Sequence, residues 1–196
     1  MDDIVRQAMA KWPNVPHCYG WLALDARGAW RMRDERAQHL GLPGDKLANQ
    51  ALVGFINRNY ARDERGCWYF QNGPQRVYLQ LEATPFVART DPSLGLVLHT
   101  GEAVADIDEA FMTPAGALVV RSGDKAAQVD DRDMAQLTGW LRHGGEPVSD
   151  ETLLEWMEAP DSTLALRYAS RDITVQPLAD SDIEARLGFT RKPSPR

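Results

Sequence analysis

The residues best suited to bind a ligand gather around one predicted β-hairpin in the window from Asp63 to Arg89. The guanidinium of Arg76 offers a fork of N–H donors that fits a carboxylate or a phosphate. The carboxylate of Glu82 can transfer a proton or pair with Arg76. Because Arg and Glu on the outer face of a hairpin also form solvent-exposed cross-strand pairs, both interpretations stay open. The predicted binding residues are Asn72, Gln75, Arg76, Tyr78, Glu82 and His17, with Gln71 beside them.

A small acid–base enzyme is the alternative function. Its proton-transfer group would be Glu82, His17 or His99, and at least two of these would have to share a cleft. The sequence contains no Walker A loop, no G-x-G-x-x-G, no H-E-x-x-H and no serine in a G-x-S-x-G context. The lack of these motifs lowers the expectation of catalysis, so we assign no catalytic residue.

Metal binding is poorly supported by the spacing of the available ligands. A structural zinc site shows paired ligands a few residues apart, and no such pair occurs here. We therefore predict no metal and no cofactor, and we expect both cysteines to be free thiols because the cytoplasm keeps thiols reduced. The soft side chains considered are His17, Cys18, Cys67, His39, His99 and His143.

The charge balance argues against a general nucleic-acid surface. The chain has 196 residues, a net charge of −6 and a sequence pI near 5.2, whereas nonspecific nucleic-acid affinity comes from clustered Lys and Arg. The first hundred residues nevertheless hold 12 Lys or Arg against 10 Asp or Glu. Nucleic-acid binding would require a contiguous basic patch from Arg27, Arg31, Arg33, Arg36, Arg58, Arg62 and Arg65.

Composition and hydropathy predict an ordinary globular protein. Hydrophobic residues make up 43% and charged residues 26% of the chain, which suits one good core or two small ones. No window approaches the roughly 18 to 20 apolar residues of a membrane helix, and the N-terminus lacks a signal-peptide core. We expect a cytoplasmic protein that does not enter a membrane.

The central hairpin contains the strongest β-forming run in the sequence. Asn72 and Gly73 tolerate the positive φ angles of a tight reversal. On the second arm, Val77, Leu79 and Leu81 alternate with polar or amphipathic residues, which predicts one apolar face against which the rest of the fold packs.

Other elements follow from periodicity and from helix or turn signals. An Asp-x-Arg-Gly-x-Trp pattern at Asp25 and again at Asp63 predicts recurring turns before strands. Helices are expected over 3–11, 45–60, 131–143, a short stretch after 149, and 180–187. Strands are expected at 21–24, 29–32, 95–99, 117–121, 125–129, 163–168 and 171–176.

This order of hairpins and helices predicts an α+β fold with an antiparallel sheet built from hairpins. We place a hairpin-rich domain over residues 1–125, a smaller unit over 126–190 and a disordered tail over 191–196, with one single domain as the alternative. Trp12, beside two prolines, is expected to be partly exposed. Trp140 and Trp156 offer a surface through which a homodimer could form.

Three segments carry a resemblance to a known family: Lys11–Leu22, Phe55–Tyr60 and Trp68–Tyr78. Over roughly residues 3–100, and again near Ile183 to Pro193, the chain resembles an uncharacterised proteobacterial family built on a domain of unknown function. That resemblance implies no activity. The function predicted from the residues is a non-catalytic binding or accessory protein that recognises a partner protein or a small molecule. Its surface would comprise the hairpin 72–76 and the preceding segment 12–20.

Overall fold

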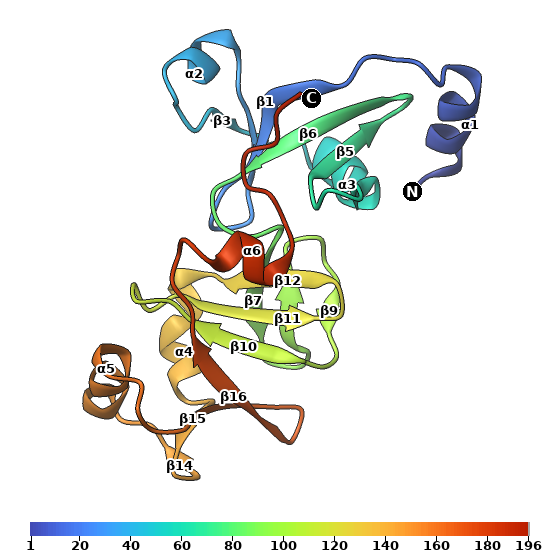
Figure 1. Cartoon of the computed structure of the whole chain (residues 1–196). Coiled ribbons are helices and arrows are strands. Elements are labelled where there is room, and N and C mark those ends of the chain that lie inside the picture. The colour runs from blue at the N-terminus through green and yellow to red at the C-terminus, as the bar shows by residue number, and fades with distance from the viewer. Residues whose placement is uncertain (196) are drawn as a thin grey trace. The chain divides into compact units, whose positions relative to one another are not determined.

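The structure, a computed structural model, describes residues 1–195 and divides into two compact units (Figure 1). Unit 1 comprises Met1–Pro85 and the segment that starts at Gly188, and unit 2 comprises Phe86–Leu187. The boundary predicted near residue 125 lies inside unit 2. A division there would separate strand β12 (Lys125–Val129) from strand β7 (Phe86–Asp91), with which it pairs in parallel.

Unit 1 is built on a six-stranded sheet in the order β3-β2-β1-β6-β5-β4. Its strands are β1 Cys18–Leu24, β2 Trp30–Met32, β3 Asp45–Lys46, β4 Tyr60–Arg62, β5 Trp68–Asn72 and β6 Gln75–Leu81. Its helices are α1 Asp3–Lys11, α2 Glu35–His39 and α3 Gln50–Arg58. The ring of Phe55 on α3 meets the ring of Phe70 on β5 at a centroid distance of 5.5 Å, so α3 covers one face of this sheet.

Unit 2 contains a ten-stranded sheet in the order β14-β13-β15-β16-β10-β11-β12-β7-β8-β9. The strands not yet given are β8 Gly95–Leu98, β9 Ala103–Val104, β10 Glu109–Met112, β11 Leu118–Ser122, β13 Leu141–His143, β14 Glu146–Pro147, β15 Leu164–Tyr168 and β16 Arg171–Pro177. The helices are η1 Asp131–Asp133, α4 Met134–Thr138, α5 Asp150–Glu158 and α6 Ile183–Leu187.

The α+β class is confirmed, but the prediction of an antiparallel sheet is wrong in part because both sheets are mixed. Strand β1 runs parallel to β6 in unit 1, and unit 2 contains the parallel pairs β10–β16 and β12–β7. Turn signals in a sequence identify strands that are neighbours along the chain. The three parallel pairs join strands far apart in sequence, so no turn signal marks them.

The central hairpin is confirmed, but its turn is Gly73-Pro74 and not the expected Asn72-Gly73. Asn72 pairs with Gln75, which leaves Gly73 and Pro74 as the turn, and Gly73 has φ +56°. The second face of this arm is not fully exposed to solvent, because Tyr78, which lies on it, is only 2% exposed. Both faces of β6 are therefore covered.

Two predicted helices are wrong at one end. The helix expected from residue 45 begins after Asn49, whose side chain accepts a hydrogen bond from the amide of Leu52, while Asp45 belongs to β3. The helix expected over 131–143 ends at Thr138, because the following residues pair with β15 as strand β13. The short helix α2 was not predicted.

The segment after residue 187 is ordered against unit 1, contrary to the predicted disorder of 191–196. The backbone of Thr190 bridges to Cys67, and the carbonyl of Arg191 accepts a hydrogen bond of 2.9 Å from the amide of Leu81. Residue 196 lies outside the described part of the chain.

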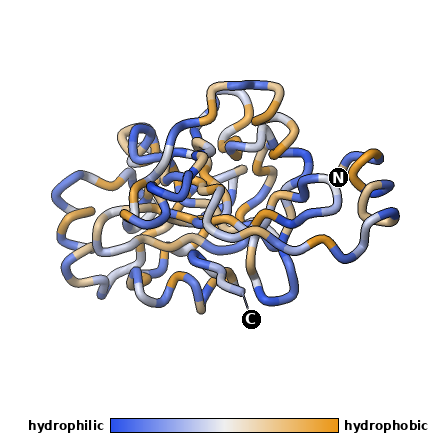
Figure 2. Tube along the Cα trace, turned by 90° about the horizontal axis from the view of Figure 1, so that it is seen from above, coloured by the Kyte–Doolittle hydropathy of each residue, from blue (hydrophilic) through white to orange (hydrophobic). Residues whose placement is uncertain are grey.

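Apolar residues remain on the surface at both ends of α1, where Figure 2 shows polar and apolar residues alternating beside the N-terminus. Ile4 is 72% exposed and Trp12 is 51% exposed, as predicted for Trp12. Trp156, which the sequence placed with Trp140 at a dimer surface, is buried, and its ring N–H donates to the carbonyl of Ser162. No helix within residues 1–195 is long and apolar enough to cross a membrane.

The first prediction concerns Asp130, whose buried carboxylate accepts hydrogen bonds from the amide and guanidinium of Arg132. These bonds lower the pKa of Asp130 to about 2, below the value of about 3.9 in an unfolded chain. The unfolded state therefore takes up the proton first as pH falls, and the stabilisation present above about pH 4 is lost towards pH 2.

We expect Asp130→Asn to lower the free energy of unfolding by roughly 1–2 kcal/mol at pH 7 and to flatten its decrease between pH 5 and pH 3. Urea unfolding at these pH values measures both effects. Asp124→Asn, which changes an exposed carboxylate of the same unit, is the control. An unchanged pH dependence in the Asp130 variant would contradict the assignment.

Candidate functional site

Three tyrosines form a row across the middle of the unit 1 sheet: Tyr19 on β1, Tyr78 on β6 and Tyr69 on β5. Tyr78 is paired in register with Tyr19 on one side and with Tyr69 on the other. Residues paired in this way point to the same face of a sheet. The rings of Tyr19 and Tyr78 stack at a centroid distance of 4.7 Å and an angle of 5°, and those of Tyr69 and Tyr78 lie 5.5 Å apart. We call this set the tyrosine row.

A tight turn between β4 and β5 brings charge to the tyrosine row. The carboxylate of Asp63 accepts hydrogen bonds from the amides of Cys67 and Arg65, at 3.0 and 2.9 Å. It also accepts from the guanidinium of Arg65 and from the hydroxyl of Tyr78, each at 3.0 Å. Gly66 closes the turn with φ +77°, and a Cβ there would lie 2.5 Å from the carbonyl oxygen of Gly188. The turn therefore fixes Asp63 and Arg65 beside Tyr78.

Within residues 1–195, two guanidinium groups meet the tyrosine row, but only one carboxylate does. Arg65 lies over the ring of Tyr78 at 5.4 Å, and Arg76 lies over the ring of Tyr69 at 4.6 Å. Arg65 forms an ion pair with Asp63, whereas within residues 1–195 Arg76 has no carboxylate within salt-bridge distance. The local charge is thus positive, in a chain whose net charge is −6.

The protonation states follow from these contacts. Burial alone would raise the pKa of Asp63, but hydrogen bonds from Cys67, Arg65 and Tyr78 outweigh it and hold the pKa below the ordinary value. Burial raises the pKa of Tyr69 more than the nearby Arg76 lowers it. At neutral pH the row therefore presents an ionised Asp63 and a neutral Tyr69 hydroxyl that can donate a hydrogen bond.

An open cleft of about 480 Å³ lies at the tyrosine row. It is lined by His17, Tyr19, Asp63, Arg65, Tyr78 and Pro195. The ring of His17 meets Tyr78 edge to face at 5.6 Å. Phenol, guanidinium and imidazole groups can all donate hydrogen bonds, and the aromatic rings can stack on a flat molecule. Chemically, the cleft suits a ring that carries an anionic group.

Only part of the predicted binding set comes together here. His17 and Tyr78 line the cleft, and Arg76 adjoins it through Tyr69. Asn72 and Gln75 face each other at the hairpin turn, where the side-chain amide of Gln75 donates to the carbonyl of Pro16 and ties the 12–20 segment to the hairpin.

Glu82 does not pair with Arg76. Its carboxylate accepts a hydrogen bond of 3.0 Å from the amide of Ala26 and lines a different cleft. The groups of the acid–base alternative are also separated, because Glu82 and His17 line different clefts. His99 belongs to unit 2, where its Nδ1 accepts a hydrogen bond from the amide of Val87.

The arginines considered for nucleic-acid binding are largely occupied. Arg31, Arg58 and Arg65 form ion pairs with Asp25, Asp2 and Asp63, respectively, and Arg33 is buried. Both cysteines are free thiols. Among residues 1–195, no group of three or more His, Cys, Asp or Glu side chains is arranged to hold a metal ion.

Sequence reasoning missed Tyr19, Tyr69, Asp63 and Arg65 as members of one site. The Asp-x-Arg-Gly pattern at Asp63 predicts a turn, and the structure shows that this turn also places its Arg beside Tyr78. Alternation in β5 and β6 puts Tyr69 and Tyr78 on the face opposite Phe70. Their meeting with Tyr19 depends on the parallel register of β1 and β6.

Comparison with known proteins places the chain without assigning an activity. The model of the family DUF2944, described as "Protein of unknown function (DUF2946)", matches residues 1–194. No curated protein matches the sequence. Among solved structures the chain is similar to a DUF1285 family protein from Silicibacter pomeroyi, with a TM-score of 0.52 and 15% identity over 90% of this chain and 96% of that one. At this identity the likeness shows a shared fold.

The second prediction tests whether Asp63 organises the site. We expect Asp63→Asn to lower the free energy of unfolding by about 2 kcal/mol, because an amide cannot accept all of the hydrogen bonds that the carboxylate accepts. Chemical unfolding followed by tryptophan fluorescence measures the change. Glu64→Gln, at an exposed position of the same turn, is the matched control. Equal stability of the two variants would show that the Asp63 contacts contribute nothing.

Proposed function

This chain belongs to DUF2944, a family of proteins of unknown function, and we propose that it is a binding or accessory protein that holds a small aromatic anion at the tyrosine row. The observation that carries the proposal is the excess of guanidinium over carboxylate at the row. In the described part of the chain, Arg65 and Arg76 face three phenol rings and a single carboxylate, that of Asp63. A ligand with one negative group would neutralise the remaining positive charge.

The position of Tyr19 indicates that the ligand contains an aromatic ring. At its register position β1 has β6 on one side, while β2 pairs with β1 only from Leu22 to Leu24. The row of rings therefore ends at Tyr19, which is half-buried and lines the cleft. A flat ring can extend the row by offset or edge-to-face contact, worth about 0.5–1.5 kcal/mol beyond the area that it buries.

The size of the cleft favours a small molecule over a protein partner. Ligand pockets typically enclose a few hundred cubic ångströms, and this cleft measures about 480 Å³. Of the binding residues predicted from the sequence, the proposal uses His17, Arg76 and Tyr78. Arg76 attracts the anion through charge, while His17 and Tyr78 line the cleft.

The third prediction follows from this proposal and uses three matched probes: benzoate, phenyl phosphate and the uncharged benzamide. In isothermal titration calorimetry, benzoate and phenyl phosphate should bind more tightly than benzamide. Arg76→Ala should weaken both anions by about tenfold, since one charge-assisted interaction is worth at least about 1.4 kcal/mol, and should leave benzamide unchanged. Tyr19→Leu should weaken all three probes, because it removes the ring.

Arg62→Ala removes the same charge from an exposed position on the neighbouring strand β4 and should change none of the affinities. Thermal melts establish that each variant is folded. Equal affinity for benzoate and benzamide in the unmodified protein would overturn the proposal. Binding that is insensitive to both Arg76→Ala and Tyr19→Leu in folded variants would overturn it too.

A further inference from the structure

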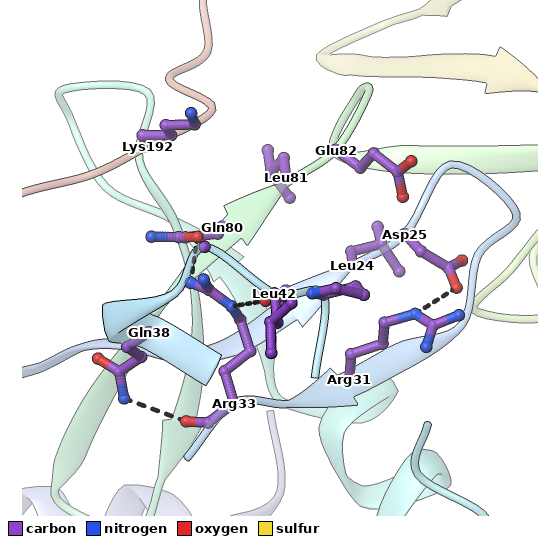
Figure 3. A pocket seen from close by; sticks show the side chains of 13 residues that line it. Leu24, Asp25, Arg31, Arg33, Gln38, Leu42, Gln80, Leu81, Glu82 and Lys192 are labelled. Atoms are coloured by element: carbon purple, nitrogen blue, oxygen red, sulfur yellow. Dashed lines mark hydrogen bonds and ion pairs between the residues drawn. The ribbon is translucent and has the colours of Figure 1, made fainter. Parts of the chain in front are cut away.

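A second cleft in unit 1 lies beyond the tyrosine row and uses none of its side chains. Figure 3 shows this cleft, about 430 Å³ in volume, between the ends of β1 and β6, strand β2, helix α2 and the loop that follows it. We call it the Arg33 cleft, after the arginine that forms part of its lining. The C-terminal segment adds Lys192 to its rim.

One end of the Arg33 cleft is positive and rich in amides. Arg33 is 6% exposed, and its four hydrogen bonds all go to uncharged oxygens. These acceptors are the carbonyls of Leu42 at 2.9 Å, Gly20 at 3.4 Å and Ala37 at 3.2 Å, and the side-chain oxygen of Gln80. Within residues 1–195, no carboxylate forms an ion pair with Arg33. A buried cation without a countercharge attracts an anion to the cleft.

Four hydrogen bonds use four of the five N–H donors of a guanidinium. In the part of the chain that the structure describes, one donor of Arg33 therefore remains for a ligand. Gln38, Gln80 and Lys192 lie on the same side of the cleft (Figure 3) and can donate further hydrogen bonds. This end suits a carboxylate.

The opposite end of the Arg33 cleft carries two carboxylates, Asp25 and Glu82 (Figure 3). Asp25 is neutralised by an ion pair of 2.8 Å with Arg31. Glu82 has no such partner: its Oε2 accepts the amide of Ala26, and across residues 1–195 its Oε1 has no hydrogen-bond partner. A ligand ammonium group can therefore pair with Glu82.

Between the two ends the cleft is apolar. Leu24, Leu42 and Leu81 lie between the basic and the acidic side chains in Figure 3, and Pro43 also lines the cleft. Leu24 and Leu81 are almost fully buried beneath the cleft, while Leu42 is 44% exposed. Further apolar area at Leu42 would be removed from water when an apolar ligand group fills the space.

We propose that the Arg33 cleft binds a small zwitterion, an ω-amino acid in which an apolar methylene chain separates the two charged groups. The carboxylate would lie at the Arg33 and Lys192 end, the ammonium group at Glu82, and the methylene chain against the leucines. This site is distinct from the tyrosine row, so the two proposals stand or fall separately.

The fourth prediction tests the zwitterion with probes that differ by one group. 6-Aminohexanoate carries both charges, hexanoate lacks the ammonium group, and pentylamine lacks the carboxylate. In isothermal titration calorimetry, 6-aminohexanoate should bind at least about tenfold more tightly than either analogue. Glu82→Gln keeps an oxygen that can accept the amide of Ala26, so the variant should fold, and its preference for 6-aminohexanoate over hexanoate should disappear.

Lys192→Ala should weaken the binding of 6-aminohexanoate and hexanoate several-fold and leave that of pentylamine unchanged. Lys46→Ala, an exposed lysine of the same sheet outside the cleft, is the matched control and should have no effect. The proposal is overturned if 6-aminohexanoate does not bind, if it binds no better than its analogues, or if folded Glu82→Gln retains the full preference.

Discussion

The parallel pairing of β1 with β6 is the constraint on which both candidate sites depend. At one end of the pair, Tyr19 faces Tyr78 and completes the tyrosine row. At the other end, Leu24 faces Leu81 and forms the apolar floor of the Arg33 cleft. The register shifts between these ends, where Gly20 and Trp21 have no partner on β6. Because of this bulge, the two ends of β1 pair with β6 in two different registers.

The bulge is held in place by the buried guanidinium of Arg33. Gly20 adopts φ +81°, and a Cβ at this position would lie 2.6 Å from the side-chain oxygen of Gln38. The carbonyl of Gly20 is turned towards Arg33, and the amide of Arg33 donates to the carbonyl of Trp21 at 2.8 Å. One arginine thus satisfies backbone carbonyls from β1, from α2 and from the following loop, each of which would be costly to bury unpaired.

Local patterns in the sequence predicted most of the elements, and non-local pairing explains most of what they missed. The hairpin at Gly73, the turn at Asp63 and the helix after Ser149 all rest on contacts between residues close in sequence. The tyrosine row needs Tyr19 and Tyr78 in register across some sixty residues, which neither periodicity nor turn chemistry encodes. Arg76 and His17 were chosen for their chemistry and reached the row, whereas Glu82, chosen in the same way, lies on the other cleft.

The division of unit 1 into two stretches of sequence has a consequence for the order of events during synthesis. Unit 2 lies between Pro85 and Gly188 in the chain, so Thr190 and Arg191 emerge from the ribosome after all of unit 2. Until then Cys67 and the amide of Leu81 lack their partners, Lys192 is missing from one cleft and Pro195 from the other. Domains generally fold in the order of synthesis. Unit 1 is synthesised first but completed last, because its final segment follows unit 2. A nascent chain therefore cannot form either complete cleft before unit 2 has been synthesised.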